Sequence, residues 1–133
     1  MLLSRPDVPR PSVTACDQAR SLLERALGPS KVLTEHDACE RFVRDESEAV
    51  GVVPVAVVLA ENAEDILAAL RVAREVEVPI TPRSGGTGRT GGSVPVAGGI
   101  VLSTLGMKSI VEIDRREGVA AFNQKRLAVF QGR

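Results

Sequence analysis

The sequence predicts an α+β fold class, in which a β-α-β unit leads into a glycine-rich loop and further short strands. Two short aliphatic runs flank a segment whose apolar residues recur at three- and four-residue steps, the spacing of one helix face. Seven of the 12 glycines then crowd between Pro82 and Gly99. Two more aliphatic runs, at 99–103 and 110–113, predict the further strands.

The composition is that of one soluble globular domain. A chain of 133 residues suffices for a single hydrophobic core, and 44% of its residues are hydrophobic and 26% charged. Seventeen basic residues balance 17 acidic ones, and there is no Trp or Tyr for bases to stack on, so the composition argues against nucleic-acid binding. No apolar run is long enough for a secretory signal or a transmembrane helix, so we expect a cytoplasmic protein.

The first third of the chain predicts two helices. Residues 1–13 hold three prolines among polar neighbours, which indicates a flexible N-terminal segment. A helix is predicted from Thr14, where Thr14 and Asp17 have the spacing of a capping box, up to Gly28. A second, short helix is predicted over 37–44.

The middle of the chain predicts the β-α-β unit. Residues 52–59 are rich in β-branched side chains and predict a strand buried on both faces, with Pro54 near its start. Asn62 is predicted to cap a helix whose apolar positions continue to Val76. Residues 78–81 predict the next strand, and this order of elements builds a parallel pair of strands through a right-handed crossover.

The glycine-rich segment P-R-S-G-G-T-G-R-T-G-G-S, residues 82–93, is open to three interpretations. Residues 86–91 satisfy the dinucleotide-binding pattern G-x-G-x-x-G, but Pro95 and further glycines directly after it exclude the helix that this pattern needs. A second interpretation is a glycine-rich hairpin or bulge without a ligand. The third is an anion cradle, in which successive backbone N–H groups close around phosphate oxygens while Arg83 and Arg89 offset their charge. A P-loop is excluded because the chain has no Gly-Lys-Ser/Thr.

The density of glycines favours the cradle over a bare turn, which needs only one or two of them. Hydroxyl side chains at Ser84, Thr87 and Thr90 add to the polar character of the segment. Hydrogen bonds from N–H groups to a charged acceptor contribute roughly 1.5–3 kcal/mol each, so three or four of them would offset the desolvation of a pyrophosphate.

The chain also resembles a known family, the FAD-linked oxidases whose FAD-binding domain is of the p-cresol methylhydroxylase and vanillyl-alcohol oxidase (PCMH) type. The similarity covers residues 30–118 and includes V-A-V-V-L-A, the capped helix, V-P-I-T-P-R-S-G-G-T-G-R-T-G-G-S-V-P-V-A-G-G-I-V-L-S and M-K-S-I-V-E-I-D. Within the family it resembles most the glycolate oxidase and D-lactate dehydrogenase branch. The fold that this implies is the first lobe of a PCMH-type FAD-binding domain.

The resemblance implies FAD as the cofactor, with its pyrophosphate held by the glycine-rich loop. The cofactor-binding residues that it implies are Pro82, Arg83, Ser84, Gly85, Gly86, Thr87, Gly88, Gly91 and Gly92. Some relatives carry R-S-G-G-H and attach the flavin covalently through the histidine. This chain has Thr87 at the matching position, which implies non-covalent FAD.

Other polar residues carry weaker signals, and none is assigned as a catalytic residue or metal ligand. His36, the only histidine, has acidic neighbours near a predicted helix start and fits a solvated position. Cys16 and Cys39 lack the spacing of a metal site and are expected to be free thiols. Residues 45–47 match a D-E-S stretch of the family, yet physically they are an ordinary acidic loop. Met107 matches a family position near the flavin and is equally explained as a gap-filling core side chain.

These expectations divide the chain into a flexible segment (1–13), a partial FAD-binding domain (14–118) and a divergent C-terminal tail (119–133). In the family, a second lobe adds flavin contacts and a separate domain supplies the substrate and catalytic groups, so a second polypeptide with those parts is one implied partner. The expected function is FAD binding within an oxidoreductase that acts on a 2-hydroxy acid. The alternatives are a non-catalytic nucleotide-binding or interaction module and a truncated remnant without activity.

Overall fold

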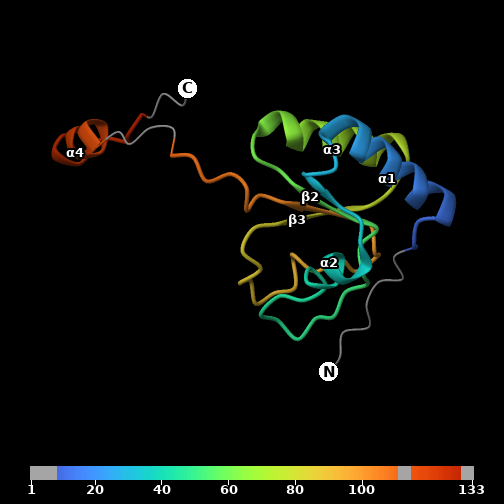
Figure 1. Cartoon of the computed structure of the whole chain (residues 1–133). Helices are drawn as coiled ribbons and strands as arrows, with labels where there is room; N and C mark the ends of the chain where they lie inside the picture. Colours follow the sequence, from blue (N-terminus) through green and yellow to red (C-terminus); the bar gives the residue numbers. More distant parts are fainter. Residues whose placement is uncertain (1–8, 111–114, 130–133) are drawn as a thin grey trace.

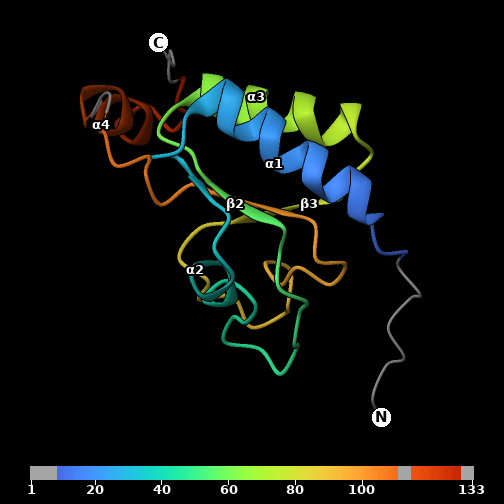
Figure 2. The same ribbon diagram turned by 45° about the vertical axis from the view of Figure 1, so that its right-hand side comes forward.

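The computed structural model describes residues 9–110 and 115–129, and these form a mixed α and β fold around a small sheet. Helices α1 (Val13–Leu27) and α3 (Ala63–Glu75) lie side by side on one face of the sheet, and the short helix α2 (His36–Glu40) lies on the other (Figures 1 and 2). Helix α4 (Arg115–Asn123) stands apart from α1 and α3 (Figure 1). The predicted α+β class is confirmed.

The sheet has four strands in the order β1-β2-β4-β3. Strand β1 (Val32–Leu33) is antiparallel to β2 (Ala56–Leu59), whereas β4 (Ile100–Ser103) is parallel both to β2 and to β3 (Ile80–Arg83). The predicted strand-helix-strand unit is present as β2-α3-β3, but its two strands do not pair with each other. Strand β4 is buried at all four positions, and it takes the central place between them.

Helix α1 is capped by a different residue from the one predicted. The hydroxyl of Ser12 accepts a hydrogen bond from the N–H of Ala15 at 3.1 Å, and Ser12 itself has an extended backbone. The prediction of a capping box from Thr14 and Asp17 was therefore wrong, because the helix begins before that pair and takes both residues into its first turns. The predicted end at Gly28 is confirmed, with the left-handed φ of 83° that suits a glycine.

Several predicted boundaries shift. Helix α3 is capped by Asn62 as predicted. Strand β2 is shorter than the predicted 52–59, because the N–H groups of Val52 and Val55 donate to carbonyls in the connection before β4. Strand β3 begins at Ile80, whereas the sequence predicted a strand over 78–81. Helix α2 ends at Glu40, so it is shorter than the predicted 37–44. Of the strand predicted at 110–113, Ile110 is not in a strand and the remainder lies outside the described residues.

Strands β2 and β4 are buried on both faces, as their aliphatic sequences predict. The helix-side face of β2 and β4 packs on α1 and α3 through Ala56, Val58, Ile100 and Leu102. The opposite face carries Val57 and Val101, which pack with Cys39 and Phe42. Since side chains alternate along a strand, this α2-side face also receives Arg83 and its register partner Ser103 at the carboxyl edge of the sheet.

Candidate functional site

The glycine-rich segment forms the connection between β3 and β4, residues 84–99. Because these strands are parallel neighbours, the chain must return from the carboxyl end of one to the amino end of the other, and a helix usually makes this crossover. Here residues 84–99, all of them described, contain no helix. They run along the α2 side of the sheet (Figure 1), and the second half is anchored by the buried Val94, Pro95 and Ala97. The exclusion of a helix-led dinucleotide fingerprint is thus confirmed.

The first half of this connection, residues 84–92, keeps its main-chain donors available. None of its N–H groups donates a hydrogen bond to an acceptor in the described part of the chain. Most of these residues are exposed, and among the described strands none lies on the outer side of the edge strand β3 to accept these bonds. Backbone donors without a protein acceptor are what an anion cradle requires.

The glycines of residues 84–92 fall into two groups. Gly86 and Gly91 have φ of 71° and 77°, in the left-handed region that favours glycine. The other three have room for a methyl group, since a Cβ built on them would have no neighbour closer than 3.8 Å (Gly85, Gly88 and Gly92). The first group shapes the turn, and the second leaves room for a ligand to approach the backbone closely.

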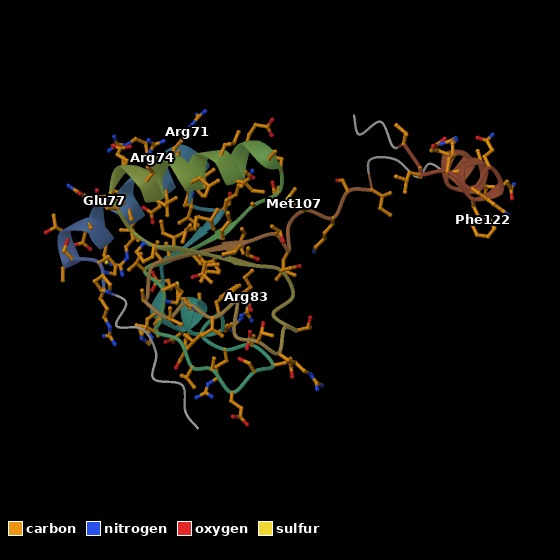
Figure 3. The ribbon with its side chains drawn as sticks, turned by 180° about the vertical axis from the view of Figure 1, so that it is seen from behind. Arg71, Arg74, Glu77, Arg83, Met107 and Phe122 are labelled. Carbon is orange, nitrogen blue, oxygen red and sulfur yellow. The ribbon has the colours of Figure 1, made fainter. Side chains whose placement is uncertain are left out.

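Arg83, the last residue of β3, lies beneath the loop on the α2 side of the sheet (Figure 3). Its Cζ is 5.6 Å from the centroid of the Phe42 ring, and its Nη1 donates to the carbonyl of Ser93 at 3.5 Å. The backbone turns around this guanidinium at Gly86, where a Cβ would overlap it. Arg83 is therefore committed to supporting the turn, whereas Arg89 is exposed and has no partner in the described part of the chain.

A second segment, residues 45–49, was interpreted from the sequence as an ordinary acidic loop, but it contacts the glycine-rich loop directly. The carboxylate of Asp45 accepts hydrogen bonds from the N–H of Ser47 at 2.8 Å, from the Ser47 hydroxyl, and from the Ser93 hydroxyl at 3.2 Å. The N–H of Glu46 donates to the carbonyl of Gly88 at 3.1 Å. These bonds, that of the Ser47 hydroxyl foremost, lower the pKa of Asp45. The D-x-S spacing, typical of a side chain that closes its own turn, is the signal that could have singled it out.

The remaining polar candidates lie at the surface. His36 is the first residue of α2, and its exposed Nδ1 is 3.6 Å from a carboxylate oxygen of Asp37. These two and Glu40 place one possible ligand atom each within 4.8 Å of one another, all on exposed side chains. Exposed acidic clusters of this kind are common without an ion, so they assign no function.

Met107 is 44% exposed on the segment that follows β4 (Figure 3), so the interpretation as a core side chain was wrong. Cys16 and Cys39 are free thiols, as expected. Burial raises the pKa of both, which makes them poor nucleophiles.

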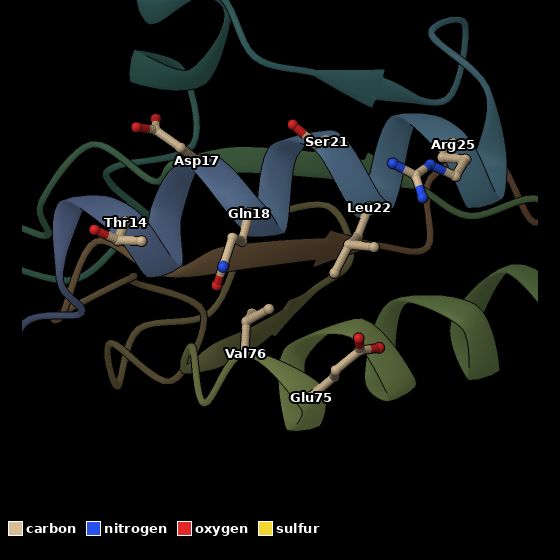
Figure 4. Close-up of a pocket in the computed structure, with 8 residues that line it drawn as sticks. All are labelled: Thr14, Asp17, Gln18, Ser21, Leu22, Arg25, Glu75 and Val76. Atoms are coloured by element: carbon tan, nitrogen blue, oxygen red, sulfur yellow. The ribbon is translucent and has the colours of Figure 1, made fainter.

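A hollow of about 550 Å³ lies between α1 and α3, on the helix side of the sheet (Figure 4). Its lining is mixed in character and comes from the two helices and the residue after α3: Thr14, Asp17, Gln18, Ser21, Leu22, Arg25, Glu75 and Val76. The glycine-rich loop crosses the opposite face of the sheet (Figure 1). The hollow is thus separate from the loop and from the residues that support it.

The sequence of the chain matches a known family. A sequence model of the family described as FAD binding domain matches residues 54–123, more than half of the chain. The chain belongs to this family of FAD-binding domains. The matched region of the FAD-binding domain runs from the start of β2 through the whole glycine-rich connection, and membership implies a flavin cofactor.

Two curated relatives of this FAD-binding domain agree with the branch expected from the sequence. The chain is 30% identical over 96 residues to a D-lactate dehydrogenase of Anaerostipes hadrus, which covers 71% of this chain and 20% of that protein. It is 31% identical over 109 residues to the glycolate oxidase subunit GlcD of Escherichia coli (strain K12), covering 82% and 21% respectively. The chain thus spans about a fifth of the length of these relatives.

A solved structure shows the same fold. The crystal structure of p-cresol methylhydroxylase with substrate bound superposes with a TM-score of 0.70 at 23% identity, over 83% of this chain and 23% of that chain. The expected PCMH-type architecture is confirmed for the part that the chain spans. Within the described residues, every helix is too short or too polar to cross a bilayer.

Proposed function

We propose that the chain binds FAD non-covalently through the glycine-rich loop, as one part of an FAD-linked oxidoreductase that acts on a 2-hydroxy acid. The observation that carries this proposal is the row of main-chain N–H groups at residues 84–92 that have no acceptor among residues 9–110 and 115–129. A pyrophosphate offers several charged oxygens, and each would accept such donors at about 1.5–3 kcal/mol per bond.

The loop residues would divide the work of holding the diphosphate. Residues 84–88 would wrap it with their N–H groups, and Gly91 and Gly92 would lie close to the same group. Pro82 and Arg83 set the direction in which the chain leaves β3, the former without an N–H to offer and the latter packed under the turn. Arg89, exposed on the loop, would supply the mobile positive charge.

The proposal of a non-covalent flavin rests on Thr87. Its side chain is exposed at the position where some members of the family carry a flavin-linked histidine, and a threonine hydroxyl is a weak nucleophile. Acid or heat denaturation should therefore release intact FAD into the supernatant. Flavin that stays with the precipitated chain would contradict this part of the proposal.

The 2-hydroxy-acid substrate is proposed from the relatives, which are named D-lactate dehydrogenase and glycolate oxidase subunit. When bound, FAD would supply the hydride acceptor, and this chain's residues would bind and orient it. From the second lobe and the separate substrate domain of the family, we also propose that a second polypeptide supplies further flavin and substrate contacts. The division into residues 1–13, 14–118 and 119–133 and a cytoplasmic location are part of the same proposal.

The direct test is a titration of the chain with FAD, ADP and riboflavin, followed by flavin absorbance and by calorimetry. If the loop holds the diphosphate, FAD and ADP will bind, and riboflavin, which lacks it, will bind far more weakly. Absence of FAD and ADP binding at about 10 μM, equivalent to about −7 kcal/mol, would overturn the proposal. If riboflavin binds as tightly as FAD, the diphosphate does not contribute to binding, and the loop is not the binding site.

A further inference from the structure

The glycine-rich loop is held from one side by residues 45–49. The carbonyl of Gly88 accepts from the N–H of Glu46, and the hydroxyl of Ser93 donates to Asp45. At Gly91 the loop passes so close that a Cβ would lie 3.0 Å from the Cβ of Ala49. All three contacts use a carbonyl, a side chain or a Cα of the loop, and none uses a loop N–H.

Asp45 is the centre of these contacts. One carboxylate oxygen accepts from the N–H and the hydroxyl of Ser47, and the other accepts from Ser93. The oxygen of that Ser47 hydroxyl accepts in turn from the N–H of Ala49 at 3.1 Å. A single carboxylate therefore fixes the shape of residues 45–49 and ties the end of the loop to them.

The charge of Asp45 would repel a bound anion if it were left uncompensated. Its Oδ2 lies 3.8 Å from the Cβ position of Gly88, directly beside the loop. The two carboxylate oxygens of Asp45 together accept three hydrogen bonds, which disperse its negative charge. The positive guanidinium of Arg83 offsets part of the same charge. The carboxylate can thus anchor the loop without cancelling its attraction for phosphate.

We propose that Asp45 is a positioning residue for the diphosphate site. It holds the glycine-rich loop through the Ser93 hydroxyl and, by fixing residues 45–49, supports the bond from the Glu46 N–H to the Gly88 carbonyl, so that the N–H groups of residues 84–92 stay available. Asp45 acts through the loop and does not contact the cofactor. This inference rests on the proposed function.

Three single variants of the full chain test the inference, with ADP as the probe of the diphosphate site and riboflavin as the probe of the ring. Asp45→Ala should weaken ADP binding at least tenfold, because the loop loses its anchor. Asp45→Asn should stay within about threefold of the wild type, since its amide accepts from Ser47 and donates to Ser93. Glu46→Ala is the matched control, because its side chain is exposed and only its main chain contacts the loop.

Hydrogen exchange in the ligand-free chain provides a readout that is independent of binding. In Asp45→Ala, the N–H of Glu46, bonded to the loop, and that of Val94, bonded to Gly91, should exchange at least tenfold faster. Amides within β2 and β4 should keep their protection. Faster exchange throughout both strands would mean that Asp45 serves general stability, and would overturn the positioning role.

The outcomes separate this inference from the proposed function. Wild-type ADP binding with an unchanged Asp45→Ala variant overturns the role of Asp45 alone. Loss of ADP binding in Asp45→Asn as large as in Asp45→Ala also overturns it, because the hydrogen bonds would then be irrelevant. If the wild type binds neither ADP nor FAD, the proposed function fails, and exchange at Glu46 and Val94 alone decides whether Asp45 anchors the loop.

Discussion

The ammonium group of Lys31 lies 2.8 Å from Oδ2 of Asp65 and 3.1 Å from Oδ1, and so joins the chain just before β1 to the first turn of α3. Asp65 is only 7% exposed, and the N–H of Glu61 also donates to its carboxylate at 2.9 Å. The carbonyl of Lys31 accepts from the N–H of Leu59 at the end of β2. This ion pair therefore links the helix layer to the edge of the sheet.

Removing the carboxylate should destabilise the fold. We expect Asp65→Ala to lower the Tm by about 5 °C or more, because Lys31 and the N–H of Glu61 then lose a buried acceptor. Glu61→Gln is the control: its carboxylate reaches Lys31 from the solvent side and is 61% exposed, so its loss should matter little. Thermal melts followed by circular dichroism measure both variants. Equal effects of the two substitutions would contradict the buried role of Asp65.

The same pair predicts a dependence of stability on pH. The hydrogen bond from Lys31, the largest cause, lowers the pKa of Asp65 in the folded chain. A carboxylate whose pKa is lowered in the folded state stabilises the fold at pH values above its unfolded pKa, about 3.9. This contribution is lost as the pH falls through the pKa of the folded state. The Tm should thus fall below about pH 4, and less steeply in Asp65→Asn. Calorimetry between about pH 2.5 and 6 measures this, and parallel curves would refute it.

Two neighbouring glycines should differ in their response to a methyl group. Gly86→Ala should cost about 1–3 kcal/mol of stability, because φ at this position is 71° and the new Cβ would overlap the guanidinium of Arg83. In Gly85→Ala the new Cβ would come no closer than 3.9 Å to a neighbour, so the Tm should stay within about 2 °C of the wild type while FAD binding weakens. Thermal melts of both variants measure the effect on loop conformation, and FAD titrations measure the effect on ligand binding. Unchanged FAD affinity in Gly85→Ala would argue against close approach of the ligand there.

Arg89 should contribute to FAD binding through long-range charge. Its side chain is exposed, so Arg89→Gln should lower FAD affinity about threefold or more at low salt and leave the Tm unchanged. At about 0.5 M salt the wild type and the variant should converge, because screening removes the contribution of an exposed charge. Arg71→Gln is the matched control, since this exposed arginine lies on α3, on the opposite side of the sheet (Figure 3). If both substitutions weaken FAD binding equally, Arg89 contributes only to the net charge of the chain and has no specific role at the loop.

The segment after α4 should stay attached to that helix well into acid. Arg126 makes two hydrogen bonds to the carboxylate of Glu117, at 2.6 and 3.0 Å, and this pair lowers the pKa of Glu117 to about 2. Because the pKa of Glu117 is lowered in the folded chain, the contact is fully present at pH values above the ordinary pKa of a glutamate. It is lost as the pH falls toward about 2. An NMR titration of the Glu117 side chain measures it. In Arg126→Gln the pKa should rise toward about 4.3, and an unchanged value would exclude the pair as the cause.

Much of the candidate site could be predicted from local sequence. The glycines, with Pro95 behind them, exclude a helix after β3, and this holds in the structure. The contribution of Asp45 could not be predicted, because its hydrogen bond to Ser93 joins positions 48 residues apart. Nothing near Asp45 in the sequence indicates which distant hydroxyl it will meet. Arg83 was expected at the site, but its position beneath Gly86 and over Phe42 depends on how three separate segments pack.

The sequence by itself determined the elements whose signals are local: α3 with its cap at Asn62, the end of α1 at Gly28, the aliphatic strand β4, and a glycine loop free of helix. Only the tertiary structure decided that β4 lies between β2 and β3, and that β2 begins late because the N–H groups of Val52 and Val55 bond to the incoming connection. The physical reason is the range of the interactions. Caps and helix periodicity depend on residues within one or two turns, whereas strand order and loop anchoring are chosen among distant donors and acceptors that meet only in the folded chain.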